Sequence, residues 1–208
     1  LGNPPRWSGG VIVMDVDDPS NISTIDTTFL SYHTSSNNSV PYQVVLDIEF
    51  DSDGNMWVAN PYCINGNNPI HVRSLNDEWK HYGSSETATR ISQSPVSIAF
   101  DTWNRTWVSA FLAEEANLGI YPNGGISMLY YEGLPYNPAN FTWEIIKYEG
   151  TVWSLGMGFN DRLYYLTPSG LNYYDINNGS NPVIRENSYA YFPNISFGRG
   201  AGIDVDHQ

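Results

Sequence analysis

Basic residues are scarce in this 208-residue chain, which has nine Lys and Arg against twenty-two Asp and Glu and a formal net charge of −13. A surface of this sign repels phosphate backbones and anionic membranes, so nucleic acid is excluded as an expected partner. No apolar run approaches the roughly eighteen residues of a membrane-spanning helix, so membrane insertion is not expected either. The single cysteine, Cys63, cannot form an internal disulfide, so cysteine content does not indicate whether the protein resides in an oxidising or a reducing compartment.

Patterns of familiar active sites and metal sites are also lacking. The four histidines form neither a His-X-His pair nor a His-Glu-X-X-His motif, and the chain contains no Gly-X-Ser-X-Gly or Gly-X-X-X-X-Gly-Lys sequence. The acidic stretch 51–55 has its glycine too early for a calcium loop and lacks a closing acidic residue, so it is interpreted as a hairpin turn. The glycine-rich stretch 198–202 leads into an expected strand and is interpreted as a connection. We therefore predict no metal ion and no cofactor.

What the chain does contain is a repeated strand-turn-strand phrase. Its copies lie at 44–60 and 96–110, with a shortened copy at 153–166 and the opening strand of another at 202–206. Apolar residues alternate with small or polar ones in each first strand, which predicts that one face of every copy is packed. The alternating apolar residues are Leu46, Ile48 and Phe50, then Val96, Ile98 and Phe100, then Leu155, Met157 and Phe159, then Ala201, Ile203 and Val205.

A second phrase, in which a glycine precedes a short apolar strand, falls between the copies of the first. Its members lie at 10–15, 125–130 and 170–175, with a looser one at 69–73. Each is expected to lead into a fourth strand, and these strands are expected at 29–33, 78–82, 141–146 and around 189–192. Equivalent positions 51, 101, 160 and 206 are 50, 59 and 46 residues apart, close to the length of a propeller blade.

The sequence therefore predicts an all-β fold, a β-propeller of four-stranded antiparallel blades in a single domain over residues 1–208. The expected parts are a partial blade at 10–33, blades at about 44–82, 95–146 and 152–192, and the start of a next blade at 200–206. Trp57 and Trp107 occupy equivalent strand positions and are expected to pack between blades.

The two ends of the chain lead to a further expectation. The chain lacks an initiator methionine and stops where the earlier copies continue, so we expect a fragment of about four blades' worth, an incomplete ring. An open arc leaves strand edges unpaired, so protein of this length is expected to aggregate or to be marginally stable.

The loops around one mouth of the central channel are the default binding site of a propeller. They join strand two to strand three and each blade to the next, and they are expected at 60–68, 111–124, near Tyr42, at 150–153 and at 197–200. Their mixture of aromatic, amide and charged side chains suits a carbohydrate or a peptide. The candidate ligand-binding residues are Asn60, Tyr62, Phe111, Glu114, Tyr121, Trp153 and Arg199.

The stretch 46–60, followed by 68–72 and 76–82, resembles the propeller repeats of bacterial hybrid two-component sensors. It is more similar still to the related propeller protein of the type IX secretion attachment complex. The resemblance covers nearly the whole chain as repeats. It implies a non-catalytic module in the periplasm or at the cell surface that binds glycans or cell-envelope proteins, joined to further blades of its parent chain. The richness in Tyr, Trp, Asn, Ser and Gly with few Lys also fits an extracytoplasmic surface.

Two other hypotheses stay open, an enzyme and a structural spacer of a large surface protein. Lactonase-like propellers, which share the Phe-Asp-X-X-Gly-Asn-X-Trp-Val phrase, hold a divalent cation at the channel mouth with Glu, Asn and Asp side chains. Lyase-like propellers use a His and an acidic residue there. Asp47, Glu49 and Asp204 on first strands, and Asn60 at the end of a second, partly permit such chemistry. However, no single carboxylate or amide recurs at one position of successive blades, and His33 has no acidic neighbour in sequence.

Overall fold

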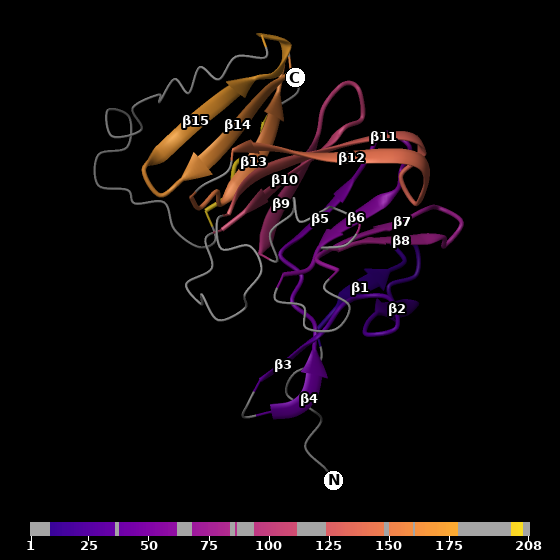
Figure 1. Ribbon diagram of the computed structural model, residues 1–208. Helices are drawn as coiled ribbons and strands as arrows, with labels where there is room; N and C mark the ends of the chain where they lie inside the picture. Colours follow the sequence, from indigo (N-terminus) through magenta and orange to yellow (C-terminus); the bar gives the residue numbers. More distant parts are fainter. Residues whose placement is uncertain are drawn as a thin grey trace.

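The computed structural model consists of antiparallel strands and describes residues 9–35, 38–61, 68–83, 86, 94–111, 124–147, 150–159, 161–178 and 201–205 (Figure 1). The helical part of these described residues is the short 3-10 turn η2 (Ile176–Asn178). Over the same residues, no helix has the length and apolar character needed to cross a membrane. The prediction of an all-β fold is confirmed.

Three sheets follow one another along the chain and radiate from a common centre (Figure 1). In each, every strand pairs antiparallel with the next in sequence, which is the order predicted for a propeller blade. The first sheet contains β5 (Asp47–Phe50), β6 (Met56–Ala59), β7 (Ile70–Arg73) and β8 (Trp79–Tyr82); the second contains β9 (Pro95–Phe100), β10 (Thr106–Ala110), β11 (Gly125–Leu134) and β12 (Asn137–Lys147); the third contains β13 (Ser154–Gly158), β14 (Arg162–Thr167) and β15 (Gly170–Asp175).

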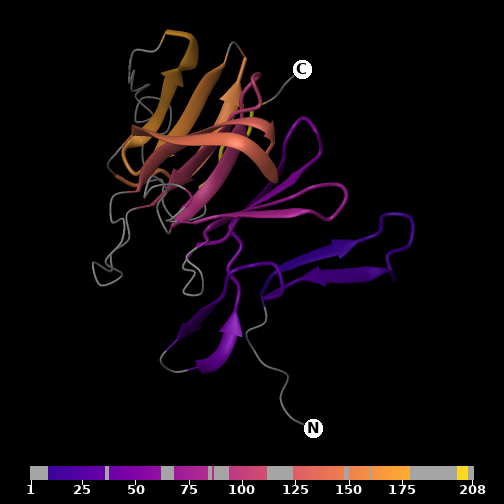
Figure 2. The ribbon, with the colours of Figure 1, turned by 45° about the vertical axis from the view of Figure 1, so that its right-hand side comes forward.

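Two hairpins precede these sheets, β1 (Val11–Met14) with β2 (Ile22–Ile25), and β3 (His33–Ser35) with β4 (Asn38–Tyr42). Figure 2 shows the second hairpin projecting away from the sheets. The prediction of a fourth strand at 29–33 is wrong, because the partner of β1 is β2. The carboxylates of Asp15 and Asp18 accept bonds from nearby backbone N–H groups, so the chain turns back soon after β1. The strand predicted around 189–192 lies outside the described residues.

The turn between the first two strands of each full sheet anchors a tryptophan. Asp51 accepts a bond from Trp57 Nε1 at 3.0 Å, and Asp101 accepts the equivalent bond from Trp107 Nε1 at 2.9 Å. Each turn contains one residue with left-handed backbone dihedral angles. This residue is Gly54 in the first turn, with φ of 80°, and Asn104 in the second, with φ of 58°. The same turn chemistry therefore fixes both indole rings.

These two tryptophans pack between neighbouring sheets, as predicted. Trp57 is fully buried, and its ring contacts Phe100 and Tyr131 of the second sheet at centroid distances of 5.8 and 6.5 Å. Trp107 lies 5.9 Å from the ring of Tyr174 on the third sheet. The apolar core is thus a series of layers between blades, which is how a repeat architecture buries its surface.

The innermost strands are linked from one blade to the next by hydrogen bonds from backbone to side chain. Asp47 Oδ2 accepts from the N–H of Ile98 at 2.7 Å, and Ser97 Oγ accepts from the N–H of Leu155 at 3.2 Å. Ser154 Oγ in turn accepts from the N–H of Ile203 at 3.0 Å. Residues 201–205 therefore lie beside β13, and the order around the centre is β5, β9, β13 and 201–205.

The apolar face of the first inner strand is exposed, contrary to the prediction that every copy is packed. Leu46, Ile48 and Phe50 are 46%, 37% and 61% exposed. The hairpin of β1 and β2 packs against Met56 and Val58 on β6 and leaves these three side chains without cover. The prediction of a packed apolar face is wrong for this copy because, among the described residues, no other inner strand lies on the side of β5 that faces away from β9.

We expect the purified chain to self-associate through this exposed face, since Ile48 and Phe50 leave two large apolar side chains exposed on the same strand. Replacing Ile48 and Phe50 by Thr should shift the protein toward the monomer in analytical ultracentrifugation. Replacing the isolated, exposed Leu75 by Thr should not change the association. A wild-type chain that sediments as a monomer at all concentrations would contradict this expectation.

Candidate functional site

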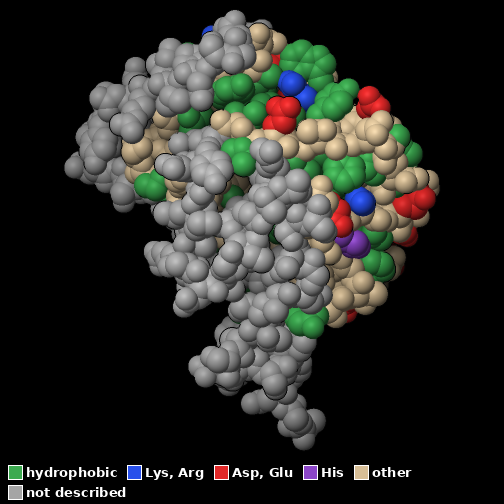
Figure 3. Space-filling view, viewed as in Figure 1, with side chains coloured by type: hydrophobic (Ala, Val, Ile, Leu, Met, Phe, Trp, Pro, Cys, Tyr) green, Lys and Arg blue, Asp and Glu red, His purple; other side chains and the backbone are tan. Residues whose placement is uncertain are grey.

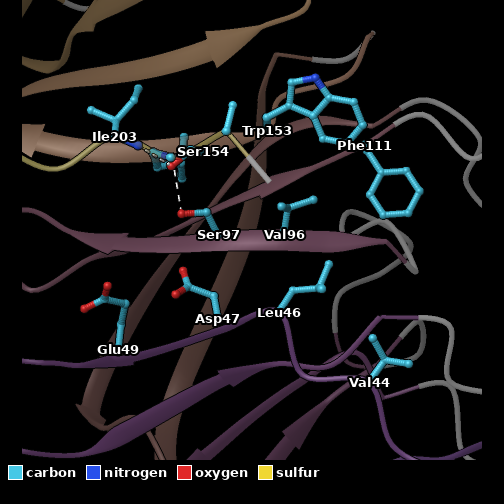
Figure 4. A pocket seen from close by; sticks show the side chains of 13 residues that line it. Val44, Leu46, Asp47, Glu49, Val96, Ser97, Phe111, Trp153, Ser154 and Ile203 are labelled. Atoms are coloured by element: carbon cyan, nitrogen blue, oxygen red, sulfur yellow. Dashed lines mark hydrogen bonds between the residues drawn. The ribbon is translucent and has the colours of Figure 1, made fainter. Parts of the chain in front are cut away.

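A cavity of about 520 Å³ lies at the centre of the arc, where the inner strands converge (Figure 4). Its wall combines apolar side chains with a few polar and acidic ones, a composition typical of ligand sites. The lining residues are Val44, Leu46, Asp47, Glu49, Val96, Ser97, Phe111, Trp153, Ser154, Leu155, Ala201, Gly202 and Ile203.

An aromatic pair forms one end of the cavity. Phe111 follows β10 and Trp153 precedes β13, and their rings stack with centroids 6.0 Å apart and planes 25° from parallel. The N–H of Val152 donates to the carbonyl of Ala110 at 3.0 Å, which holds the two connections side by side. Two predicted site residues that are 42 positions apart in sequence therefore meet in one surface.

Acidic side chains form the other end, on β5. Asp47 and Glu49 both face the cavity (Figure 4). Burial raises the pKa of Asp47, against the opposing effect of hydrogen bonds from Ile98 and Ser97. Burial also raises the pKa of Glu49, and the negative charges of Asp47 and Asp204 add to the effect. A positive charge placed at this end would be stabilised.

The remaining predicted site residues do not line the cavity or cannot be placed. Asn60 is 1% exposed, and its amide is engaged inside the fold: Nδ2 donates to the carbonyl of Val44 at 2.7 Å and Oδ1 lies 3.0 Å from His71 Nε2. Its position at the end of β6 suggested a mouth residue, but its side chain points back into the blade. The other four lie outside the described residues: Tyr62, Glu114, Tyr121 and Arg199.

The serines of the cavity were missed by the sequence reasoning. Ser97 and Ser154 line the cavity and hold successive inner strands together. The alternation of small or polar residues with apolar ones on these strands does indicate that the serines share one face. It does not indicate their hydrogen bonds, because the donors are backbone N–H groups, which have no sequence signature. Within the described ranges, no group of three or more His, Cys, Asp or Glu is placed to hold a metal ion.

A histidine pair lies outside the cavity, with His71 buried on β7 and His81 half-buried on β8. His71 Nδ1 is 2.7 Å from His81 Nδ1, and the N–H of Ser31 donates to His71 Nε2 at 3.4 Å. Burial, and next the neighbouring His81, lower the pKa of His71 to about 3. The folded protein therefore holds His71 neutral over a pH range in which a solvated histidine is charged.

We expect His71 to destabilise the fold as pH falls from about 6.5 toward 3, because only the unfolded chain takes up its proton in this range. Each pH unit in this window removes up to about 1.4 kcal/mol. Asp47, with its raised pKa, acts in the opposite direction at low pH, so the test follows the histidine itself. In NMR, the imidazole resonance of His71 should show no protonation while the protein is folded. A titration midpoint near 6.5 in the folded state would contradict it.

Comparison with known proteins identifies the fold but no family. No protein-family model and no curated protein matches the chain. Among solved structures it is similar to PorZ, a surface component of the type IX secretion system of Porphyromonas gingivalis. The TM-score is 0.58 and the identity 13%, over 88% of this chain and 25% of PorZ.

Two further structures have lower scores. The extracellular domain of a hybrid two-component system from B. thetaiotaomicron matches with a TM-score of 0.46 and 15% identity, over 84% of this chain and 22% of that one. Virginiamycin B lyase from Staphylococcus aureus matches with a TM-score of 0.46 and 12% identity, over 85% of this chain and 55% of the lyase. The likeness to PorZ, a component of the secretion system whose propeller protein the sequence resembles, confirms the β-propeller fold.

Proposed function

We propose that this chain is a non-catalytic, extracytoplasmic β-propeller recognition module, of the sensor or secretion type, that binds a glycan or a cell-envelope protein. The observation that carries the proposal is the central cavity with Phe111 and Trp153 stacked at one end. Aromatic faces contribute most of the energy at many recognition surfaces, and concave sites with a few polar groups are the usual ligand sites.

The compartment and the further partners are part of this proposal. PorZ is a bacterial surface component, and we carry its location over to this chain on the strength of the shared fold. The chain spans a quarter of the length of PorZ. The exposed side chains of Ile48 and Phe50 mark the place at which a further blade of a parent chain would pack. The acidic surface also disfavours nucleic acid as a partner, and acidic side chains are scattered over the described part of the face in Figure 3.

Removal of the Trp153 ring is expected to weaken binding by at least about tenfold, because a stacked aromatic contact is lost from the cavity. Binding of the Trp153→Ala variant would be measured on a glycan array and against purified cell-envelope fractions. The matched control is Trp103→Ala, which removes a 57% exposed indole from the turn between β9 and β10, outside the cavity. Equal binding by wild type and Trp153→Ala would contradict the proposed site.

The enzyme hypothesis keeps one supporting observation, the position of Asp47 and Glu49 inside the cavity. Lactone hydrolysis should be assayed with and without divalent cations. Under the recognition proposal no turnover appears and chelators leave binding unchanged. Cation-dependent turnover that is abolished by Glu49→Gln would replace the recognition module with a lactonase-like enzyme. Absence of both binding and turnover would favour the structural spacer.

A further inference from the structure

The central cavity has two chemically different ends joined by an apolar wall. In Figure 4, Phe111 and Trp153 lie at one end and Asp47 and Glu49 at the other, with Leu46 between them. Residues 46–49 of an extended chain span roughly 10 Å. A ligand that contacts both ends therefore needs an apolar group and a charged group separated by an aliphatic stretch or a short length of backbone.

The acidic end has no basic counterpart in the part of the chain that the structure describes. Asp47 accepts hydrogen bonds from the N–H groups of Ile48 and Ile98, so its carboxylate is held in place. Glu49 has no hydrogen-bond or ion-pair partner among the described residues. The ion pairs found there join Arg73 to Asp77 and Arg105 to Asp101, none of which lines the cavity.

The apolar wall favours an aliphatic stem over a sugar ring. Leu46, Val96 and Leu155 contribute hydrocarbon to it. Ser97 Oγ already accepts from the N–H of Leu155 and its hydroxyl donates to Asp47, and Ser154 Oγ accepts from the N–H of Ile203, so the two serines offer a ligand few free hydrogen-bonding positions. A sugar with several hydroxyl groups would lose hydrogen bonds to water that this wall does not replace. The methylenes of a Lys or Arg side chain would bury apolar area there without such a loss.

We propose that the cavity binds a basic peptide segment. The cation of a Lys or Arg lies at Asp47 and Glu49, its stem lies against Leu46, and a neighbouring apolar side chain contacts the pair of Phe111 and Trp153. This inference rests on the proposed recognition function and selects, among its two ligand classes, the peptide. It also sets the charge of the ligand as positive.

The test uses the full chain and short peptides that contain one Phe and one Lys separated by a glycine. Calorimetry should show at least about tenfold tighter binding than for the same peptide with norleucine in place of Lys. The affinity should fall as salt concentration rises, because the contact is between charges. Glu49→Gln should remove the preference for Lys over norleucine. Asp17→Asn, which removes the same charge from an exposed turn outside the cavity, should retain it.

The outcomes separate this inference from the proposed function. Equal binding of the Lys and norleucine peptides, weakened by Trp153→Ala, would overturn the charge preference and leave the recognition module in place. Tighter binding of a glucosamine oligomer than of the Lys peptide would overturn the peptide and support a glycan ligand. If no peptide, glycan or envelope fraction binds, both the inference and the proposed function fail. The comparison of Lys with norleucine needs no variant, so a misfolded Glu49→Gln protein does not remove the test.

Discussion

Replacement of Trp57 by alanine is expected to lower the free energy of unfolding by about 3–5 kcal/mol. The indole ring is fully buried and touches aromatic rings of its own sheet and of the next one, so its loss opens a cavity between two blades. The change also leaves Asp51 without the indole N–H that it binds. Trp107→Ala should have a similar effect, since Trp107 occupies the same place between the second and third sheets.

Urea unfolding followed by circular dichroism would measure this effect. Trp103→Ala is the matched control, because that ring is 57% exposed and its removal loses chiefly the contact with the Arg105 guanidinium, which contributes about 0.5–1 kcal/mol. A Trp57→Ala protein that keeps wild-type stability but loses ligand binding would move this residue from the core to the site.

Asp101→Asn should destabilise the protein by about 3 kcal/mol, an effect far larger than that of an exposed ion pair. The buried carboxylate of Asp101 accepts bonds from Arg105 Nε at 2.6 Å and from Trp107 Nε1 at 2.9 Å, and it also accepts backbone N–H groups of its own turn. An amide in its place removes the charge and presents N–H groups to donors. The guanidinium of Arg105, which also lies 4.7 Å over the ring of Trp103, would then lack its counter-charge.

The control for this prediction is Asp77→Asn, which removes the carboxylate of the exposed pair with Arg73. Asn tolerates the left-handed backbone at this position, where φ is 64°, so the substitution tests charge alone. Its expected effect is about 0–1 kcal/mol. Equal losses in the two variants, measured by thermal unfolding, would show that the buried pair contributes no more than the exposed one.

The repeated hairpins could be predicted from sequence because their information is local. Alternating apolar residues, an Asp at the start of the turn and a Trp six positions later all lie within one phrase. The structure forms both predicted hairpins and joins each Asp to its Trp, although the apolar residues of the first copy are exposed. The strand at 29–33 was predicted because each copy of the second phrase was expected to lead into a fourth strand, but Phe29 and Leu30 are held in a turn by N–H bonds to the carbonyl of Asp26. Phe29 instead stacks on Trp79 at 4.9 Å and covers the neighbouring sheet.

The candidate site was only partly predictable, because it depends on contacts between blades. Phe111 and Trp153 were both named, yet their stacking depends on the bond between Val152 and Ala110. Asn60 was named from its position at the end of a strand, and no local pattern shows that its amide would bind Val44 and His71 inside the fold. Sequence position identifies which loop a side chain occupies, while its direction depends on partners from other repeats.

The hydrogen bonds between inner strands have a fixed polarity. At each of the three junctions, the acceptor side chain belongs to the earlier strand and the donor N–H to the later one, as in Asp47 to Ile98, Ser97 to Leu155 and Ser154 to Ile203. Every junction is therefore chemically self-contained. A whole blade could be duplicated or deleted in such a series without altering the bonding at the remaining junctions, provided that its first strand keeps one short acceptor side chain. This rule makes gene duplication a simple route to propellers of different sizes, since each new copy brings with it the acceptor that the following copy requires.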